Sequence, residues 1–156
     1  MKLERSCFSP LPSVPKRLSN RVYVTTTCML SFSEIQAFEN VLRGLDALLS
    51  EDESVNPNMY ISIICSDRDT VCITIDDPDA LGRQLNLAIL PIRRWRMRHL
   101  SQLQMETCIA EELCHYFRNI TDENLVRFQV LSLLQRIRPI VQLSDVYDPN
   151  WTPDDN

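Results

Sequence analysis

Apolar and β-branched runs predict a small β-sheet in the first two thirds of the chain. Valine and threonine dominate residues 21–28, and residues 60–65 form an apolar run interrupted only by Ser62, so both segments are typical of strands. Apolar and polar residues alternate over 70–75, which predicts a further strand in a hairpin with 60–65. The run at 85–92 predicts an edge strand, because Pro91 has no N–H to donate to a neighbouring strand.

A period of three to four residues in the apolar positions predicts helices on either side of these strands. The period covers residues 33–50, with Ser33 as the expected N-cap. A long helix is expected over 96–119, and a second one over 121–138 that ends before Pro139. This order predicts an α+β fold: a small twisted sheet of about four strands, an N-terminal helix and two C-terminal helices.

The distribution of prolines and charges divides the chain of 156 residues into three parts. Residues 1–20 are expected to form an extended, proline-rich arm, residues 21–140 a single domain, and residues 141–156 an irregular acidic tail. No apolar run reaches the roughly 18 residues that a membrane span needs. The first ten residues also lack the apolar core of a signal peptide, so we expect a cytoplasmic protein without membrane contact.

Composition removes several classes of function. Glycine occurs only at Gly44 and Gly82, which excludes the glycine-rich loops that bind nucleotide phosphates. The net charge of −5 makes binding to nucleic acid or to an anionic membrane unfavourable for the molecule as a whole. The six cysteines include no C-x-x-C pair and most lie in apolar runs, so we expect reduced and mostly buried thiols.

The segment most indicative of chemistry is 107–117. On a helical wheel Glu111 and His115 share one polar face, with Glu112 at its edge and an apolar face opposite. A carboxylate and an imidazole one turn apart can hold a metal ion, with Glu112 directed at a metal-bound water. The same spacing is also typical of an ordinary surface pair, so both interpretations stay open at this stage.

Two further residues of the same helix depart from a simple amphipathic pattern. Glu106 falls among the apolar positions, so we expect a buried carboxylate with a cationic partner, for which Arg127 is one candidate. Cys108 lies toward the polar face, where it is either a thiolate ligand or a buried thiol.

The run IAEELCHYF at 109–117 resembles the metal-binding helix of the zincin metallopeptidases, whose pattern is H-E-x-x-H. Glu112 and His115 match the glutamate and the second histidine, whereas Glu111 stands where the first histidine is expected. The order of strands and helices is also similar to the zincin core, including compact zincins that cleave regulators encoded by mobile elements. The resemblance implies a zincin-like domain that binds zinc through Glu111 and His115, with Glu112 as the catalytic base.

The resemblance also implies a third metal ligand downstream of His115. Asp122 and Glu123 are the nearest candidates, although acids in the first turn of a helix also suit the helix dipole without any ligand role. The edge strand, through Leu87, Ala88 and Ile89, would then hold an extended peptide or protein substrate by β-augmentation.

Two other functions stay open from the sequence. If Glu111 in place of histidine prevents metal binding, the chain is an inactive peptidase-like scaffold that still binds a peptide or protein partner. The basic segment Arg93–His99 could instead serve a regulatory or nucleic-acid-binding module, because its arginines flank Trp95. The overall acidity and the shortness of the run make nucleic acid the less favoured partner and favour a solvated turn between the edge strand and the helix. The sequence predicts no oligomeric state.

Overall fold

A three-stranded parallel sheet forms the base of the structure. The computed structural model describes residues 10–50, 60–66 and 87–147. Within them β1 (Val22–Thr26), β2 (Tyr60–Ser66) and β3 (Leu87–Arg93) are parallel, with β2 in the middle. The domain is therefore a mixed α and β fold, as predicted, with three strands in its described part where about four were expected.

Burial along the strands explains their order. Residues 61–66 are all buried, which is typical of a central strand in a parallel sheet. Pro91 pairs with Ile64 from the outer strand β3, where a missing N–H is tolerated, so the predicted edge strand is confirmed among the described strands. Since β1 and β3 occupy both sides of β2, its described length offers no free edge for the predicted hairpin; residues 70–75 lie outside the described residues.

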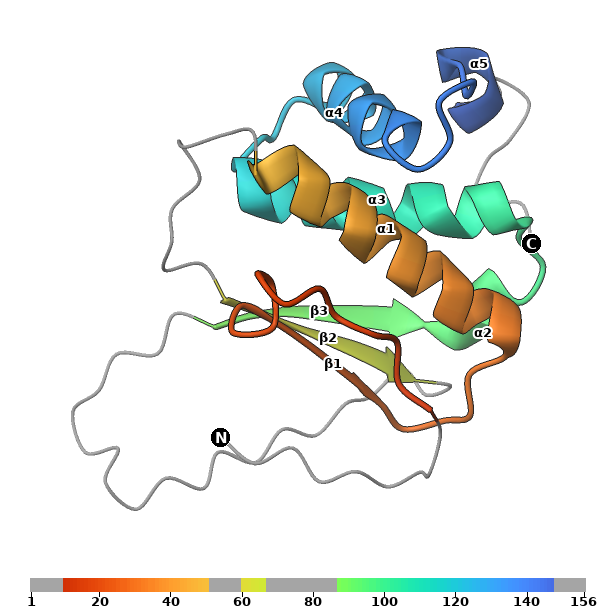
Figure 1. Ribbon diagram of the computed structural model, residues 1–156. Helices are drawn as coiled ribbons and strands as arrows, with labels where there is room; N and C mark the ends of the chain where they lie inside the picture. The colour runs from red at the N-terminus through yellow and green to blue at the C-terminus, as the bar shows by residue number, and fades with distance from the viewer. Residues whose placement is uncertain (1–9, 51–59, 67–86, 148–156) are drawn as a thin grey trace.

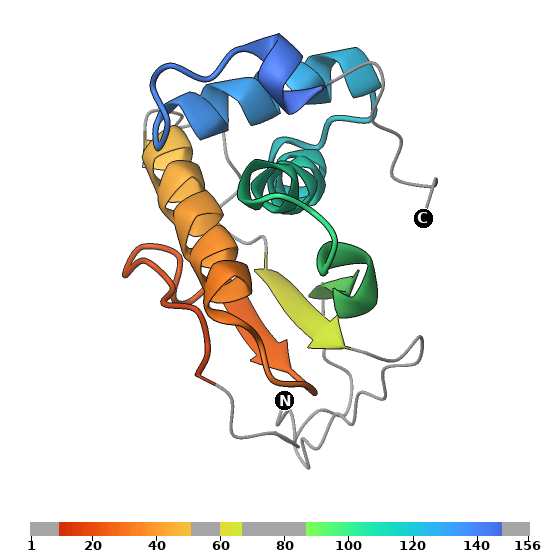
Figure 2. The same ribbon diagram turned by 90° about the vertical axis from the view of Figure 1, so that its right-hand side faces the viewer.

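The helices cover one face of the sheet in two layers (Figures 1 and 2). The long helices α1 (Phe32–Ser50) and α3 (Gln102–Arg118) lie against the sheet. The helix α4 (Glu123–Gln135) and the single turn α5 (Leu143–Val146) pack on the far side of α3. The largest fully buried side chains at these contacts include Phe38, Leu42, Leu45, Ile63, Ile109, Leu113, Leu133 and Leu134.

Helix ends account for two corrections to the predicted boundaries. The expected helix over 96–119 is divided into the single turn α2 (Arg94–Met97) and α3. Ser101 separates them: its Oγ accepts from the Gln104 N–H at 3.3 Å, and Gln104 Oε1 accepts from the Ser101 N–H at 2.8 Å, which forms a capping box.

The first long helix also starts earlier than predicted. Ser31 rather than Ser33 caps α1, because the Ser31 Oγ accepts from the Glu34 N–H at 3.3 Å and the Glu34 carboxylate accepts from the Ser31 N–H. The carboxylate of Glu34 also accepts from Arg94 Nε at 2.9 Å, which attaches α2 to the start of α1.

The two flanking segments are more ordered than the sequence indicates. Residues 10–20 contain no helix or strand, as expected, but Leu18 is only 2% exposed and belongs to the core. The Ser13 N–H donates to Glu39 Oε1 at 2.9 Å, which attaches the same segment to α1. The prediction of an irregular tail from residue 141 is wrong for α5, and residues 1–9 and 148–156 lie outside the described residues.

One glycine allows two helices to approach closely. A Cβ atom at Gly44 of α1 would lie 2.7 Å from Leu133 Cδ2 and 2.9 Å from the Leu133 carbonyl oxygen of α4. Glycine inside a helix costs about 0.5–1 kcal/mol relative to alanine. Here the missing side chain is what lets the backbones of α1 and α4 come together.

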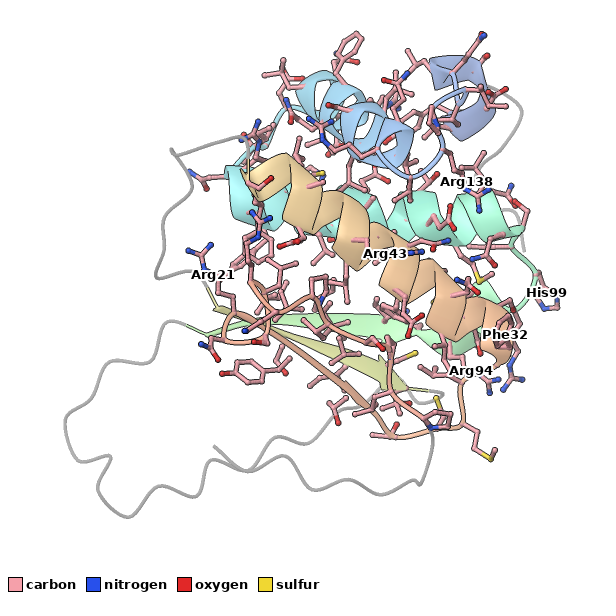
Figure 3. The ribbon with its side chains drawn as sticks, in the orientation of Figure 1. Arg21, Phe32, Arg43, Arg94, His99 and Arg138 are labelled. Carbon is pink, nitrogen blue, oxygen red and sulfur yellow. The ribbon has the colours of Figure 1, made fainter. Side chains whose placement is uncertain are left out.

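A buried ion pair joins α3 to the chain that follows α4. Glu106 is fully buried and accepts from Arg138 at 2.7 Å (Nε to Oε2) and 3.0 Å (Nη2 to Oε1), in the region labelled in Figure 3. Asn40 of α1 and Gln102 donate to the same carboxylate at 2.6 and 3.2 Å. The prediction of a buried carboxylate is confirmed, but the suggested partner Arg127 is wrong, because its guanidinium stacks on the Tyr147 ring instead.

Replacing Arg138 by methionine should lower the free energy of unfolding by about 3 kcal/mol, because it leaves the carboxylate of Glu106 buried without its counter-charge. The loss should be near the lower end of the range for broken buried pairs, since Asn40 and Gln102 still donate to the carboxylate. Urea denaturation would measure it. The control is Arg17→Met, whose 3.8 Å pair with Asp46 is largely exposed and should cost less than about 1 kcal/mol. Equal losses in the two variants would contradict this account.

Candidate metal centre

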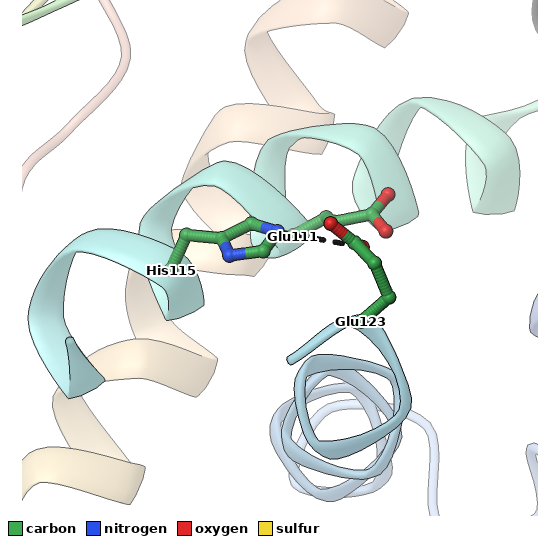
Figure 4. A group of neighbouring side chains, drawn as sticks. All are labelled: Glu111, His115 and Glu123. Carbon is green, nitrogen blue, oxygen red and sulfur yellow. Dashed lines mark ion pairs between the residues drawn. The ribbon is translucent and has the colours of Figure 1, made fainter. Parts of the chain in front are cut away.

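Three potential metal ligands converge where α3 meets the start of α4 (Figure 4). One ligand atom each from Glu111, His115 and Glu123 lies within 4.8 Å of the other two. The His115 Nε2 is 3.7 Å from Glu123 Oε2. Glu111 and His115 are partly buried and Glu123 is exposed, so the group lies at the surface with one side open to solvent.

A short turn between the two helices creates this arrangement. Glu111 and His115 are one turn apart on α3, and α3 ends at Asn119 in the left-handed region, with φ 50°. The left-handed residue reverses the chain, so that Glu123, the first residue of α4, returns to the side of His115. Asn119 is the only non-glycine residue with positive φ among the described residues.

The same turn fixes the orientation of the imidazole. The Nδ1 of His115 is 2.7 Å from the carbonyl oxygen of Ile120, and a carbonyl can only accept, so Nδ1 carries the proton. In a neutral imidazole the lone pair is then on Nε2, which is the nitrogen that faces Glu123. A backbone carbonyl that holds the second nitrogen is the usual support of a metal-binding histidine.

Negative charge is concentrated at the site. Burial raises the pKa of the Glu111 carboxyl, and the neighbouring charges of Glu123 and Glu112 raise it further, while His115 and Arg127 oppose the shift. Burial is the largest cause of this shift, and the two neighbouring carboxylates add to it. A bound cation would favour the charged form of Glu111 and lower its pKa.

The structure separates the two candidates for the third ligand. Asp122 is the N-cap of α4: its Oδ1 accepts from the Asn124 N–H at 2.8 Å and from the Leu125 N–H at 3.2 Å. Glu123 has no capping role and is the acid that lies beside His115. The side chain of Asp122 is therefore engaged with the backbone, as expected of an N-cap.

Glu112 lies near the cluster of three but is not one of its members. Its exposed side chain lines a hollow of about 310 Å³ between β3, α2 and α3, whose walls are mainly apolar and include Ile92, Met97 and Ile109. Leu87, Ala88 and Ile89 lie earlier on β3, paired with Tyr60, Ile61 and Ser62 of β2. The hollow thus places Glu112 next to the later part of the edge strand, residues 90–93, which follows the three residues predicted to hold a peptide.

The cysteines near the site are thiols. Cys108 lines the same hollow, and burial followed by the charge of Glu111 raises its pKa to about 11. Burial raises the pKa of Cys114 to about 12, again with Glu111 as the second cause. Cys28, Cys65, Cys108 and Cys114 are all free, which confirms reduced and mostly buried thiols for the described cysteines.

Part of the basic segment Arg93–His99 has a structural role. It forms the end of β3 and the single turn α2, where Arg94 pairs with the buried Glu34. Arg96 lies over the ring of Trp95, with 5.2 Å between the guanidinium carbon and the ring centroid. These contacts are those expected of a turn in which arginine side chains cover an aromatic ring.

Sequence reasoning missed one residue beside the site. The Arg127 guanidinium lies 5.1 Å from the centroid of the Tyr147 ring, and the Tyr147 hydroxyl is buried. Tyr147 comes from the segment that the sequence indicated to be an irregular tail. No periodic pattern links such a position to α3, so only the three-dimensional structure reveals it.

The chain matches no protein-family model, no curated protein and no solved structure. The resemblance to zincins therefore remains a prediction from the nine residues at 109–117 and from the order of elements. No helix within the described ranges is long and apolar enough to cross a membrane.

The capping role of Asp122 can be tested separately from any ligand role. Asp122→Ala should lower the free energy of unfolding by about 1 kcal/mol, because two N–H groups of α4 lose their acceptor. Glu123→Gln should change it less, since the lost interaction with the helix dipole is offset by relief of repulsion from Glu111. Urea denaturation of the metal-free protein compares the two variants. A larger loss from Glu123→Gln would contradict the assignment of Asp122 as the cap.

Proposed function

We propose that the protein binds a divalent metal ion, preferably zinc, through Glu111, His115 and Glu123 in a zincin-like site. The observation that carries the proposal is the convergence of three ligand atoms within 4.8 Å. The hydrogen bond from His115 Nδ1 to the Ile120 carbonyl supports it, because it leaves Nε2 free to act as a ligand.

The donor set is compatible with zinc. Zinc takes histidine nitrogen and carboxylate oxygen ligands, and three protein ligands with one open position are typical of catalytic zinc. Two carboxylates make this site harder than one with two histidines, so manganese and ferrous iron are competitors. Zinc is favoured over both because it binds nitrogen and oxygen ligands more strongly than either ion.

Zinc binding should depend on one of the two histidines. The purified protein is expected to hold one zinc ion per chain by elemental analysis, and His115→Ala should lose it. The matched control is His99→Ala, because His99 is exposed and belongs to the basic segment instead. Glu111→Gln and Glu123→Gln should also weaken binding while keeping the hydrogen bond of His115. Equal zinc content in all variants, or none in the wild type, would overturn the site.

A second candidate function is metal-dependent cleavage of a peptide. The observation that favours it is the position of Glu112, next to Glu111 in the chain and exposed to the hollow beside β3. Bound zinc would supply a polarised carbonyl and a water of lowered pKa. Glu112 would take the proton of the attacking water and pass it to the leaving nitrogen. If no cleavage occurs, the same hollow would serve a scaffold that binds the peptide.

Peptide cleavage should depend on Glu112, whereas zinc binding should not. In a fluorogenic peptide library, Glu112→Gln should lower the rate by about 10²–10⁴-fold, because a general base is lost, and should keep the zinc content of the wild type. Glu39→Gln is the control, since Glu39 lies on α1 and its amide counterpart can still accept from the Ser13 N–H. Unchanged cleavage by Glu112→Gln would contradict the assigned role. Peptide binding without cleavage would support the scaffold instead.

A further inference from the structure

Tyr147 carries a buried hydroxyl that does not stabilise the described part of the fold. The residue ends α5, where its N–H donates to the Leu143 carbonyl at 2.9 Å, and its ring packs against the core. The hydroxyl oxygen is buried and has no hydrogen-bond partner within the described part of the chain. A buried polar group without a partner is destabilising, and phenylalanine would fill the same space without that cost.

The surroundings of Tyr147 place it beside the metal site. The guanidinium of Arg127 stacks 5.1 Å from its ring, and Arg127 is one turn after Glu123 on the same face of α4. The turn α5 contacts both α3 and α4, the two helices that supply the ligands. Burial is the main cause of a raised pKa of the Tyr147 hydroxyl. The negative charge of Glu111 raises this pKa further, and no other charged group in the described part of the chain affects it as strongly.

Glu111 needs a donor that the metal-free fold does not provide. Within the described residues no group donates a hydrogen bond to its carboxylate, although Asp122 and Glu106 accept two or more each. Carboxylates that ligate a metal are themselves usually held by hydrogen bonds, which fix the orientation of the ligating oxygen. Among the described residues, Tyr147 thus brings a hydroxyl without a partner to the region where α5 contacts α3, the helix whose Glu111 carboxylate has no donor.

We infer that Tyr147 is a positioning residue of the proposed metal site, whose hydroxyl donates to Glu111 when that carboxylate binds the metal. The inference rests on the proposed function, because it assigns a role to Tyr147 only when Glu111 is a ligand. One oxygen of Glu111 binds the ion and the other accepts from the tyrosine. The stacked Arg127 holds the ring in place from the side of α4.

The test is Tyr147→Phe, which removes only the hydroxyl and keeps the ring on which Arg127 stacks. Titration of the metal-free protein with zinc against a chromophoric chelator should show affinity about 10–100-fold weaker than that of the wild type. Metal-free stability in urea should be unchanged or higher, because a buried hydroxyl without a partner has been removed. The control is Tyr23→Phe, since Tyr23 is 47% exposed on β1, and it should leave zinc affinity unchanged.

A double-mutant cycle shows whether Tyr147 acts through Glu111. In a Glu111→Gln background, Tyr147→Phe should change zinc affinity by about twofold or less, because the acceptor of the hydroxyl is already altered. With Co²⁺ in place of zinc, Tyr147→Phe should also shift the visible absorption bands of the bound ion, and Tyr23→Phe should not. Such a spectral change would not follow from a loss of packing remote from the ligands.

The two proposals fail in different ways. Zinc binding by the wild type with equal affinity in Tyr147→Phe would overturn the inference and leave the metal site intact. A lower metal-free stability of Tyr147→Phe would also overturn it, because the hydroxyl would then have a partner in the fold. A wild type that takes up no zinc would overturn the proposed function and the inference together.

Discussion

The buried ion pair between Glu106 and Arg138 sets the relative position of the helices on which the candidate site depends. Glu106 lies on α3, five residues before Glu111, and Arg138 follows α4, which begins with Glu123. A fully buried carboxylate is stable only beside its counter-charge, so α3 and the end of α4 are stable in one docked arrangement. Asn40 brings α1 into the same arrangement, because it donates to the same carboxylate.

Local features were predictable from the sequence, whereas contacts between distant segments were not. The period of the apolar residues predicted the ends of α1 and α4 to within a few residues. It also predicted that Glu111 and His115 share one face of a helix. Glu123 was predictable as a candidate because the connection between the helices is short. Neither the partner of Glu106 nor the parallel pairing of β2 follows from any local pattern, since each is decided by packing between segments far apart in the chain.

The candidate site combines features that oppose the stability of the fold. It collects carboxylates around one imidazole in a chain that is already acidic, and Arg127, a cation that acts on Glu111, is stacked on an aromatic ring. Such local conflicts are frequent at functional sites, where stability elsewhere in the fold offsets them. In this protein the apolar contacts among α1, α3 and α4 are the part of the structure that offsets them.

The close approach at Gly44 has a consequence for how the sequence can change. The two atoms of α4 nearest to a Cβ at this position include a backbone oxygen, which cannot be removed by substitution at Leu133. A larger residue at 44 therefore has to displace α4 itself, and with it the helix that carries Glu123. In a set of related sequences, position 44 should stay glycine wherever the acid at 123 is retained.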